Sequence, residues 1–171
     1  MKKIILCGYM ASGKTTIARL LAQASGITYL DLDEVIEQQT GKTIPQLFLE
    51  GGEIQFRKKE HIALKEIVNK NESFILSLGG GTPCYANNHE FLQRDDVLSI
   101  YLKTSIKEVV SRIETQSNER PMLNNLRGEE LEEFVAKHLF DRSYYYMQAK
   151  HRVATDDKSL EAIVNEIMSL L

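Results

Sequence analysis

Short apolar runs alternate with longer helical patterns along this chain of 171 residues, and that alternation constrains the fold more than any other feature. The runs are rich in apolar or β-branched residues, which predicts five strands, at 4–7, 28–30, 74–78, 97–102 and 152–154. Helical periodicity predicts six helices, at 15–24, 33–40, 53–69, 106–114, 129–149 and 160–171. Alternating strands and helices favour a parallel sheet with helices on both faces. We therefore expect a three-layer α/β/α fold in one domain that spans residues 1–171.

The charge balance and the apolar segments exclude several classes of protein. Lys and Arg number 21 against 24 Asp and Glu, so the chain lacks the positive surplus that holds a nucleic-acid backbone. No run approaches the roughly 18 apolar residues of a membrane span, and the run that follows the N-terminus stops at Gly8 without a cleavage site. Cys7 and Cys84 have no His or Cys companion at a metal-ligand spacing. We expect a cytoplasmic protein with neither a nucleic-acid nor a membrane partner.

Residues 8–15 read Gly-Tyr-Met-Ala-Ser-Gly-Lys-Thr and match the phosphate-loop pattern G-x-x-x-x-G-K-[ST]. The pattern lies between a predicted strand and a predicted helix, and this context disfavours an ordinary glycine turn. In such a loop backbone N–H groups surround a phosphate, Lys14 reaches the β and γ oxygens, and Thr15 offers its hydroxyl to Mg²⁺. ATP is a better candidate than GTP, because residues 69–72 only weakly match the guanine-reading pattern. The expected nucleotide contacts are Ala11, Ser12, Gly13, Lys14, Thr15 and Thr16.

Two aspartates follow the second predicted strand. Asp31 and Asp33 are two residues apart, so in an extended segment both carboxylates face the same side. The carboxyl end of this strand is expected beside the phosphate loop, where one carboxylate can hold Mg²⁺ through water and the other can accept a proton from a substrate hydroxyl. The alternative is that Asp31 or Asp33 only caps the next helix, and Asp31 with Glu34 has the spacing of a capping box.

Two arginines are predicted to face inward. Arg57 and Arg142 each fall on the apolar stripe of a predicted helix, and Glu60 stands one turn from Arg57, where it can brace the guanidinium. Either arginine alone fits a side chain whose stem packs on apolar surface while its head reaches water. Two together favour an anion pocket, and a planar guanidinium is suited to a carboxylate. The second substrate is therefore expected to carry a carboxylate as well as a hydroxyl.

Two further segments have the composition of site loops. Gly79, Gly80 and Gly81 follow a predicted strand, where glycines let the backbone approach a ligand, although a flexible turn explains them equally well. No acidic residue ends this strand, so Asp31 is the available metal ligand. Residues 115–128 are polar and contain Pro121 between two helical patterns, which predicts a mobile lid.

These motifs together resemble the shikimate kinase family in identity and spacing, over nearly the whole chain. The resemblance rests on residues 8–15, Leu30-Asp31-Leu32-Asp33, Phe56-Arg57 with Glu60, Leu78-Gly79-Gly80-Gly81, Arg120-Pro121, and Arg142 with Tyr146. It implies a P-loop kinase fold with strand order 2-3-1-4-5. It also implies transfer of the γ-phosphoryl group of ATP to the 3-hydroxyl of shikimate, a step of aromatic amino acid biosynthesis, by a monomer that uses Mg²⁺.

The resemblance also implies roles for individual residues. Lys14 and Asp33 would be catalytic, and Arg112 and Arg120 would contact ATP. The metal would be held by Thr15 and, through water, by Asp31. The acceptor would contact Asp33, Arg57, Gly79, Gly80, Gly81 and Arg142.

The sequence departs from the family pattern at two places, and two alternative functions stay open. Ala11 stands where the family often has glycine, at a cost of about 1 kcal/mol if the position needs a positive φ. The family's Arg-x-Pro-x-Tyr is Arg-Ser-Tyr-Tyr-Tyr at residues 142–146. A different small-metabolite kinase, such as a gluconate kinase, shares the phosphate loop but does not need the two arginines. A nucleotide-dependent switch leaves Asp33, Arg57 and Arg142 unexplained.

Overall fold

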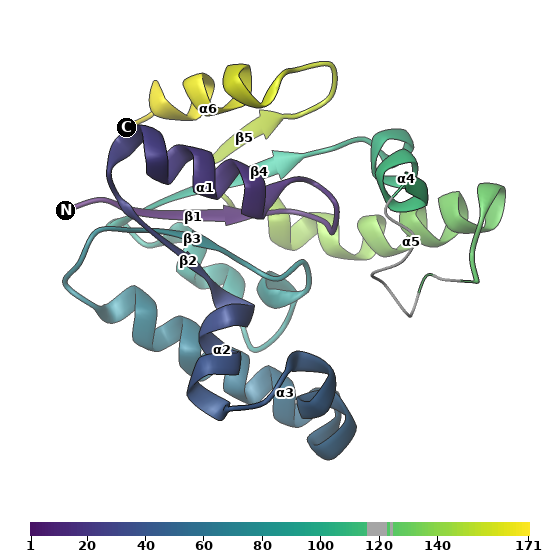
Figure 1. Ribbon diagram of the computed structural model, residues 1–171, viewed down its shortest axis with the longest axis horizontal. Helices are drawn as coiled ribbons and strands as arrows, with labels where there is room; N and C mark the ends of the chain where they lie inside the picture. Colours follow the sequence, from purple (N-terminus) through teal and green to yellow (C-terminus); the bar gives the residue numbers. More distant parts are fainter. Residues whose placement is uncertain (116–122, 124) are drawn as a thin grey trace.

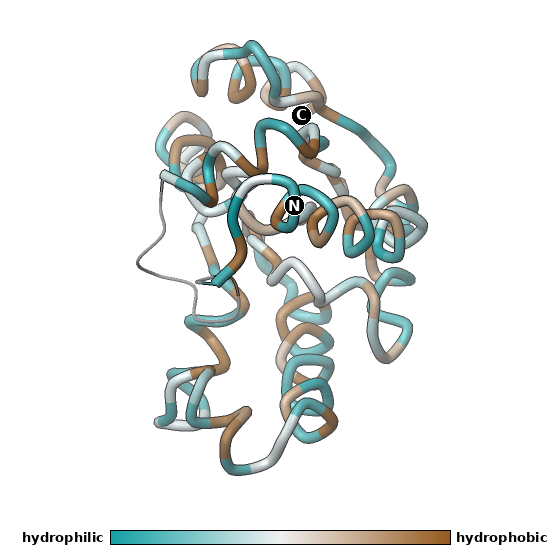
Figure 2. The backbone as a smooth tube through the Cα atoms, turned by 90° about the vertical axis from the view of Figure 1, so that its right-hand side faces the viewer, coloured by the Kyte–Doolittle hydropathy of each residue, from teal (hydrophilic) through white to brown (hydrophobic). Residues whose placement is uncertain are grey.

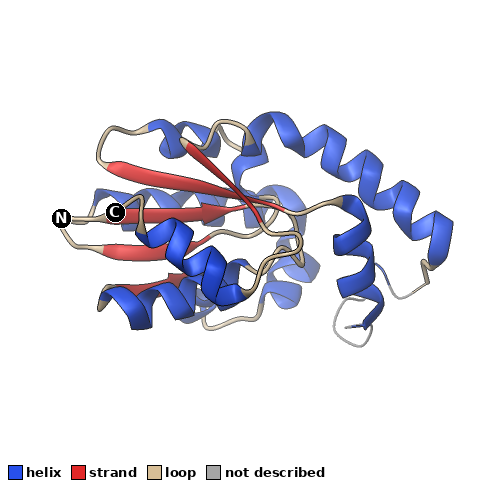
Figure 3. Ribbon diagram, turned by 90° about the horizontal axis from the view of Figure 1, so that it is seen from above, coloured by secondary structure: helices blue, strands red, loops and turns tan. Residues whose placement is uncertain are grey.

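Five parallel strands form one sheet in the order β2-β3-β1-β4-β5, which confirms the predicted order (Figure 1). The computed structural model describes residues 1–115, 123 and 125–171. The strand arrows point the same way, so the ends of the strands that precede the site loops lie at one edge (Figure 3). The strands are β1 (Lys3–Cys7), β2 (Thr28–Asp31), β3 (Phe74–Ser77), β4 (Val97–Lys103) and β5 (His151–Ala154).

Helices cover both faces of the sheet, as the alternating pattern predicts. On one face lie α1 (Lys14–Ser25) and α6 (Leu160–Met168), and the opposite face carries α3 (Ile44–Asn69) and α5 (Gly128–Tyr146) (Figure 1). Two shorter helices, α2 (Leu32–Thr40) and α4 (Ile106–Thr115), pack on α3 and α5 respectively. Apolar and polar residues alternate along these helices (Figure 2), as expected for helices with one buried and one exposed face.

The central strand β1 separates two apolar cores. Ile4 and Leu6 point into the core beneath α1 and α6, while Ile5 and Cys7 point into the core beneath α3 and α5. All four side chains are fully buried, as expected for a strand in the middle of a sheet that is covered on both faces. No helix among the described residues has both the length and the apolar content needed to cross a bilayer.

The structure corrects several predicted boundaries, and α3 shows the largest difference. This helix begins at Ile44 rather than at residue 53, because Thr43 and Gln46 form a capping box that starts a helix there. Gly52, at φ 68° and ψ 179°, then interrupts the helix and hides its periodicity from the sequence. The structure also ends α5 at Tyr146 and α6 at Met168, earlier than predicted, and it adds the 3₁₀ helices η1 (Thr82–Cys84) and η2 (Asn88–Gln93). Residues 116–122 and 124 of the predicted lid lie outside the described residues.

Candidate active site

The loop between β1 and α1 encloses the ammonium group of Lys14. Lys14 Nζ donates hydrogen bonds to the backbone carbonyls of Gly8 and Tyr9, over 2.9 and 2.8 Å. The side chain is only 9% exposed, so these contacts hold a positive charge inside the loop. That charge, the loop N–H groups and the N-terminus of α1 make this a site for anionic oxygens. The residues from Gly8 to Thr16 are called the phosphate side below.

Ala11 takes the left-handed conformation in this loop, with φ at 60°. An alanine there carries steric strain of about 1 to 2 kcal/mol that glycine avoids. The Ala11 carbonyl accepts a hydrogen bond of 3.0 Å from Arg112 Nη1, and Arg112 also pairs through Nε with Glu108 at 2.8 Å. These contacts bring the Arg112 guanidinium from α4 to the phosphate side, where the sequence placed it, whereas Arg120 lies outside the described residues.

Asp31 caps α2, which is one of the roles that the sequence left open, and its second carboxylate oxygen lies beside Thr15. Its Oδ1 caps α2 by accepting from the backbone N–H groups of Asp33 and Glu34, at 3.0 and 3.4 Å. Its Oδ2 accepts from the hydroxyl groups of Thr15 and Tyr29, at 3.3 and 3.2 Å. The cap thus fixes a carboxylate that keeps an oxygen next to the Thr15 hydroxyl.

Asp33 stands in the first turn of α2 and faces the same pocket as Lys14 and Asp31. Burial, together with the nearby carboxylates of Asp31 and Glu60, raises the pKa of Asp33 from 3.8 to about 6. Lys14 and Arg57 oppose this rise. A carboxyl group whose pKa lies near neutrality in a cleft is suited to hold or accept a proton. The pocket has a volume of about 690 Å³, and its lining includes Ala11, Gly13, Lys14, Thr15, Thr16, Asp31, Asp33, Gly79, Gly80 and Arg112.

Arg57 is held by a buried carboxylate. Its Nη1 lies 2.8 Å from Glu60 Oε2, the i,i+3 brace that the sequence predicts. Glu60 is 1% exposed, and its Oε1 accepts a hydrogen bond of 2.6 Å from the Thr82 hydroxyl. The guanidinium is therefore paired inside the protein instead of reaching into water, and the alternative of an arginine that only covers apolar surface is wrong here.

The loop at residues 79–81 brings the two arginines, Asp33 and the phosphate side together. A Cβ atom at Gly81 would lie 2.7 Å from Arg57 Nη2, and one at Gly80 would lie 3.3 Å from the Met10 backbone nitrogen and 3.5 Å from Arg142 Nη1. A Cβ at Gly79 would lie 3.5 Å from Asp33 Oδ1. Any side chain at Gly81 would push the guanidinium away, so this loop needs glycine for close approach and is not merely a flexible turn.

Arg142 reaches this loop from α5. Its guanidinium lies 5.9 Å from the centre of the Tyr9 ring, and the Tyr146 hydroxyl donates to the Gly80 carbonyl over 2.5 Å. The helix runs unbroken through residues 142–146, so the change from the family pattern leaves Arg142 directed at Gly80. We call Asp33, Arg57, Gly79–Gly81 and Arg142 the arginine side of the site.

The sequence analysis missed several side chains that support this site. Thr82 holds Glu60, Tyr85 lies against Arg57, and the Tyr9 hydroxyl is 3.0 Å from His138 Nδ1. Thr82 and Tyr85 follow the glycine loop directly, and this position was the only sequence signal for them. Tyr9 occupies a variable position of the phosphate-loop pattern, and His138 is one of four scattered histidines, so neither carries a local signal.

Thr15 in the first turn of α1 and Asp31 at the end of β2 suit a hard cation. Thr15 and Asp31 offer a hydroxyl and a carboxylate oxygen 3.3 Å apart, the donor type that Mg²⁺ prefers. Among the described residues, no group of three His, Cys, Asp or Glu side chains is placed to hold a metal.

A phosphate loop at the edge of a parallel sheet, with Asp33 in the same pocket and two arginines at the adjoining glycine loop, is the arrangement of a P-loop kinase for a small anionic acceptor. The profile of the family described as shikimate kinase matches residues 10–171. The chain therefore belongs to the shikimate kinase family.

Relatives and solved structures agree with this assignment. The shikimate kinase of Flavobacterium psychrophilum is 55% identical over 171 residues, which cover 100% of this chain and 99% of that protein. The crystal structure of shikimate kinase from Bacteroides thetaiotaomicron superposes with a TM-score of 0.90 at 32% identity, covering 99% of this chain and 97% of that one. The shikimate kinase of Acinetobacter baumannii, solved in complex with shikimate, gives a TM-score of 0.85 at 33% identity, covering 99% and 92%.

Proposed function

We propose that this enzyme transfers the γ-phosphoryl group of ATP to the 3-hydroxyl of shikimate, giving shikimate 3-phosphate and ADP for the synthesis of aromatic amino acids. The observation that carries the proposal is the convergence of Asp33, Arg57 and Arg142 on the loop at residues 79–81, next to the phosphate side. Shikimate presents one carboxylate and three hydroxyl groups, which matches two guanidinium groups and a carboxylate of raised pKa. The relative from Acinetobacter baumannii was solved with shikimate, which further supports this choice of acceptor.

The phosphate side holds ATP in this proposal. The residues from Ala11 to Thr16 surround the phosphates with N–H groups, and Lys14 and Arg112 neutralise the oxygens of the transferring group. Thr15 and, through water, Asp31 would hold Mg²⁺, which supplies further neutralisation of the β and γ oxygens. Arg120 stays a nucleotide contact predicted from the sequence alone.

The arginine side holds the acceptor. Arg57 and Arg142 bind the carboxylate of shikimate, and the glycine loop lets the ring of the acceptor approach the backbone. Asp33 accepts a hydrogen bond from the reacting hydroxyl and aligns its oxygen with the γ-phosphorus. That oxygen forms the new bond to phosphorus while the bond from phosphorus to the β–γ bridging oxygen breaks, and the hydroxyl proton passes to Asp33 or to water.

The test is a measurement of ATP consumption with shikimate, quinate and gluconate as acceptors, followed by identification of the product by phosphorus NMR. We expect shikimate to have the highest kcat/KM and the phosphate to be on the 3-oxygen. Preferred turnover of gluconate would establish the alternative metabolite kinase. ATP hydrolysis unaffected by any of the three acids would instead favour a nucleotide switch.

The same proposal includes the organisation of the chain and its location. We propose that residues 1–171 act as one kinase domain, as a monomer in the cytoplasm. Two free cysteines, Cys7 and Cys84, are consistent with a reducing compartment. Sedimentation at several concentrations, with and without ATP, measures the oligomeric state.

A further inference from the structure

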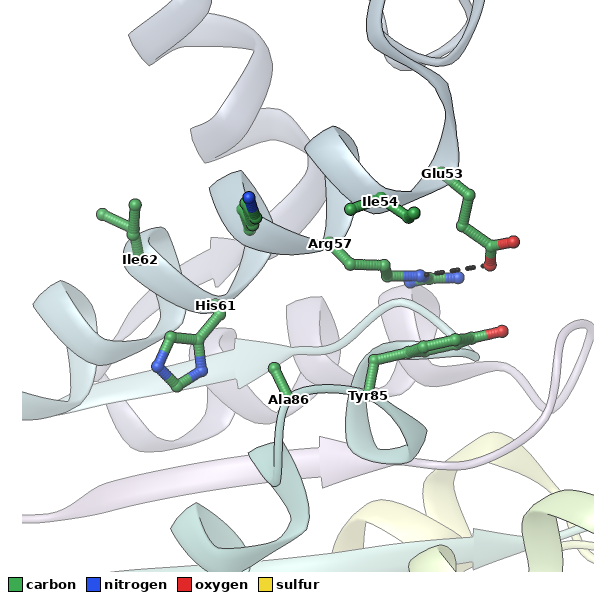
Figure 4. A pocket seen from close by; sticks show the side chains of 8 residues that line it. Glu53, Ile54, Arg57, His61, Ile62, Tyr85 and Ala86 are labelled. Carbon is green, nitrogen blue, oxygen red and sulfur yellow. Dashed lines mark ion pairs between the residues drawn. The ribbon is translucent and has the colours of Figure 1, made fainter.

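A cavity of about 570 Å³ opens beside Arg57, between α3 and the turn that follows η1 (Figure 4). Arg57 and Glu53 reach it from α3, and Tyr85 forms part of the opposite wall. Arg57 therefore has two environments, since its Nη2 meets the glycine loop at Gly81 and the rest of its guanidinium borders this cavity. The proposed function uses only the first of these contacts.

The ring of Tyr85 lies against the face of the Arg57 guanidinium. Figure 4 shows Tyr85 beneath Arg57. Arg57 Cζ is 4.0 Å from the centre of that ring, compared with 5.1 Å from the centre of the Phe56 ring. An arginine that stacks at this distance on an aromatic face is attracted by the π electrons and loses rotational freedom. Burial and the nearby carboxylate of Glu53 raise the pKa of Tyr85, so the phenol stays neutral.

One carboxylate fixes an edge of the same guanidinium, because Glu60 Oε2 is 2.8 Å from Nη1. Glu53 Oε1 forms a longer ion pair, 3.5 Å from Nε (Figure 4), and Nε makes no hydrogen bond within the described part of the chain. Thr82, which holds Glu60, and Tyr85 both belong to the short segment that follows the glycine loop. One segment thus supports Arg57 twice, through Glu60 at its edge and through the aromatic ring at its face, and it leaves Nη2 directed toward Gly81.

We propose that Tyr85 is a positioning residue that fixes the plane of the Arg57 guanidinium for the carboxylate of the acceptor. The inference rests on the proposed function, because it takes Arg57 to bind that carboxylate. Without the ring, the ion pair with Glu60 still holds one edge of the guanidinium but not its plane, so the plane must be ordered again each time the acid binds. Loss of the ring therefore weakens binding of the acceptor acid and leaves ATP binding unchanged.

Two substitutions separate the ring from the hydroxyl group. Tyr85→Phe keeps the stacked ring, so the KM for shikimate should stay within about twofold of wild type, whereas Tyr85→Leu should raise it about five- to twentyfold. The KM for ATP and kcat at saturating acid should change by less than about twofold in both variants. Tyr144→Leu is the matched control, because it removes an exposed tyrosine that lies outside the site. A wild-type KM for shikimate in Tyr85→Leu overturns the proposal, and so does an equal rise of both KM values with a lower melting temperature.

A fluorescence measurement tests the stack without using the activity. The chain contains no tryptophan, so Tyr85→Trp provides a single indole at this position. Its emission should change when Arg57→Ala is added to the same variant, and it should change again when shikimate, but not ATP, saturates the single variant. If wild type fails to phosphorylate shikimate, the proposed function fails while the first emission difference still reports the stack. Emission that is identical with and without Arg57 shows that the ring does not position the guanidinium.

Discussion

The two sides of the site are assembled in different ways. The phosphate side consists of consecutive residues whose backbone groups and one buried lysine face the ligand. The arginine side takes Asp33 from α2, Arg57 from α3, the glycine loop after β3 and Arg142 from α5. A backbone cradle tolerates changes of most side chains, whereas a cluster of charged side chains depends on partners such as Glu60 and Thr82. The phosphate side is thus a local device, and the arginine side requires the whole fold.

The largest effect is expected at the one side chain on which the phosphate side depends. Lys14→Ala should reduce kcat at least about 100-fold, or about 2.7 kcal/mol, because it removes the charge that neutralises the transferring oxygens. The fold should survive, since the backbone of the loop keeps its own hydrogen bonds. Lys65→Ala on the exposed face of α3 is the control. Near-normal turnover in Lys14→Ala, measured beside circular dichroism of both variants, would refute the assignment of the phosphate side.

The second largest effect is expected when either arginine is removed, and it should affect binding of shikimate but not of ATP. Arg57→Ala and Arg142→Ala each remove a charged hydrogen bond worth about 1.5 to 3 kcal/mol, so the KM for shikimate should rise about 10- to 150-fold while ATP binding stays intact. Arg57→Ala should also lower the melting temperature, because it leaves Glu60 buried without its cation. Calorimetric titration of each variant with shikimate and with ATP measures the two affinities. Normal binding of the acid by both variants would make the arginines purely structural.

Asp33 links the two sides and gives the site its pH dependence. Its pKa is about 6 in the folded protein against an ordinary 3.8, so the folded state binds the extra proton between these values. The contribution of Asp33 to stability is therefore fully present below about pH 4 and is lost as the pH rises through 6. The shift corresponds to about 3 kcal/mol at neutral pH. Asp33→Asn avoids this cost, but it also loses the attraction between a carboxylate and the N-terminus of α2. The free energy of unfolding should therefore increase by about 1 to 2 kcal/mol at pH 8.

Denaturant unfolding at pH 4 and pH 8 measures this gain, which should vanish at pH 4. The kcat/KM of wild type should fall below about pH 6, as protonated Asp33 no longer accepts from the acceptor hydroxyl. Asp33→Asn should retain more activity than Asp33→Ala, because phosphoryl transfer depends on alignment more than on removal of the proton. Equal and severe losses in both variants, with binding of the acid preserved, would identify Asp33 as an obligatory base instead.

The sequence predicts the phosphate side and the arginine side for different physical reasons. Residues 8–15 could be interpreted from local order alone, because a strand, a tight loop and a helix follow each other directly. Asp31 and Asp33 were found because parallel strands end at one edge. Arg57 and Arg142 were found because a charged residue on an apolar stripe stands out against the helical period.

Most of the features that the sequence analysis did not predict depend on tertiary contacts. The first turns of α3 were missed because the periodicity breaks at Gly52, although Thr43 and Gln46 carry a cap that is visible in the sequence. Thr82 and Tyr85 gain their roles only when the turn after β3 packs against α3. The Tyr9 hydroxyl lies 3.0 Å from His138 Nδ1, although the two residues are distant in the sequence. No local pattern connects them.

The smallest effect is expected at Ala11, where the backbone of the phosphate loop is strained. Ala11→Gly relieves a left-handed alanine, worth about 1 to 2 kcal/mol, but it also frees the unfolded chain, which costs about 0.4 to 1 kcal/mol. The net gain of about 0.5 to 1 kcal/mol should raise the melting temperature by about 1 to 4 °C. Ala86→Gly is a matched control, since Ala86 has φ at 50° outside the loop and should give a similar rise.

The two variants should differ in their affinity for ATP. The methyl group of Ala11 restricts a loop that must be ordered around the phosphates, and glycine restores freedom that ATP then has to remove, at about 0.5 to 1 kcal/mol. The KM for ATP should therefore rise about two- to fivefold in Ala11→Gly and stay unchanged in Ala86→Gly, with the KM for shikimate unchanged in Ala11→Gly. A fall in melting temperature for Ala11→Gly alone would mean that the methyl group stabilises the loop by packing more than it strains the backbone. In that outcome the phosphate side, like the arginine side, depends on its side chains.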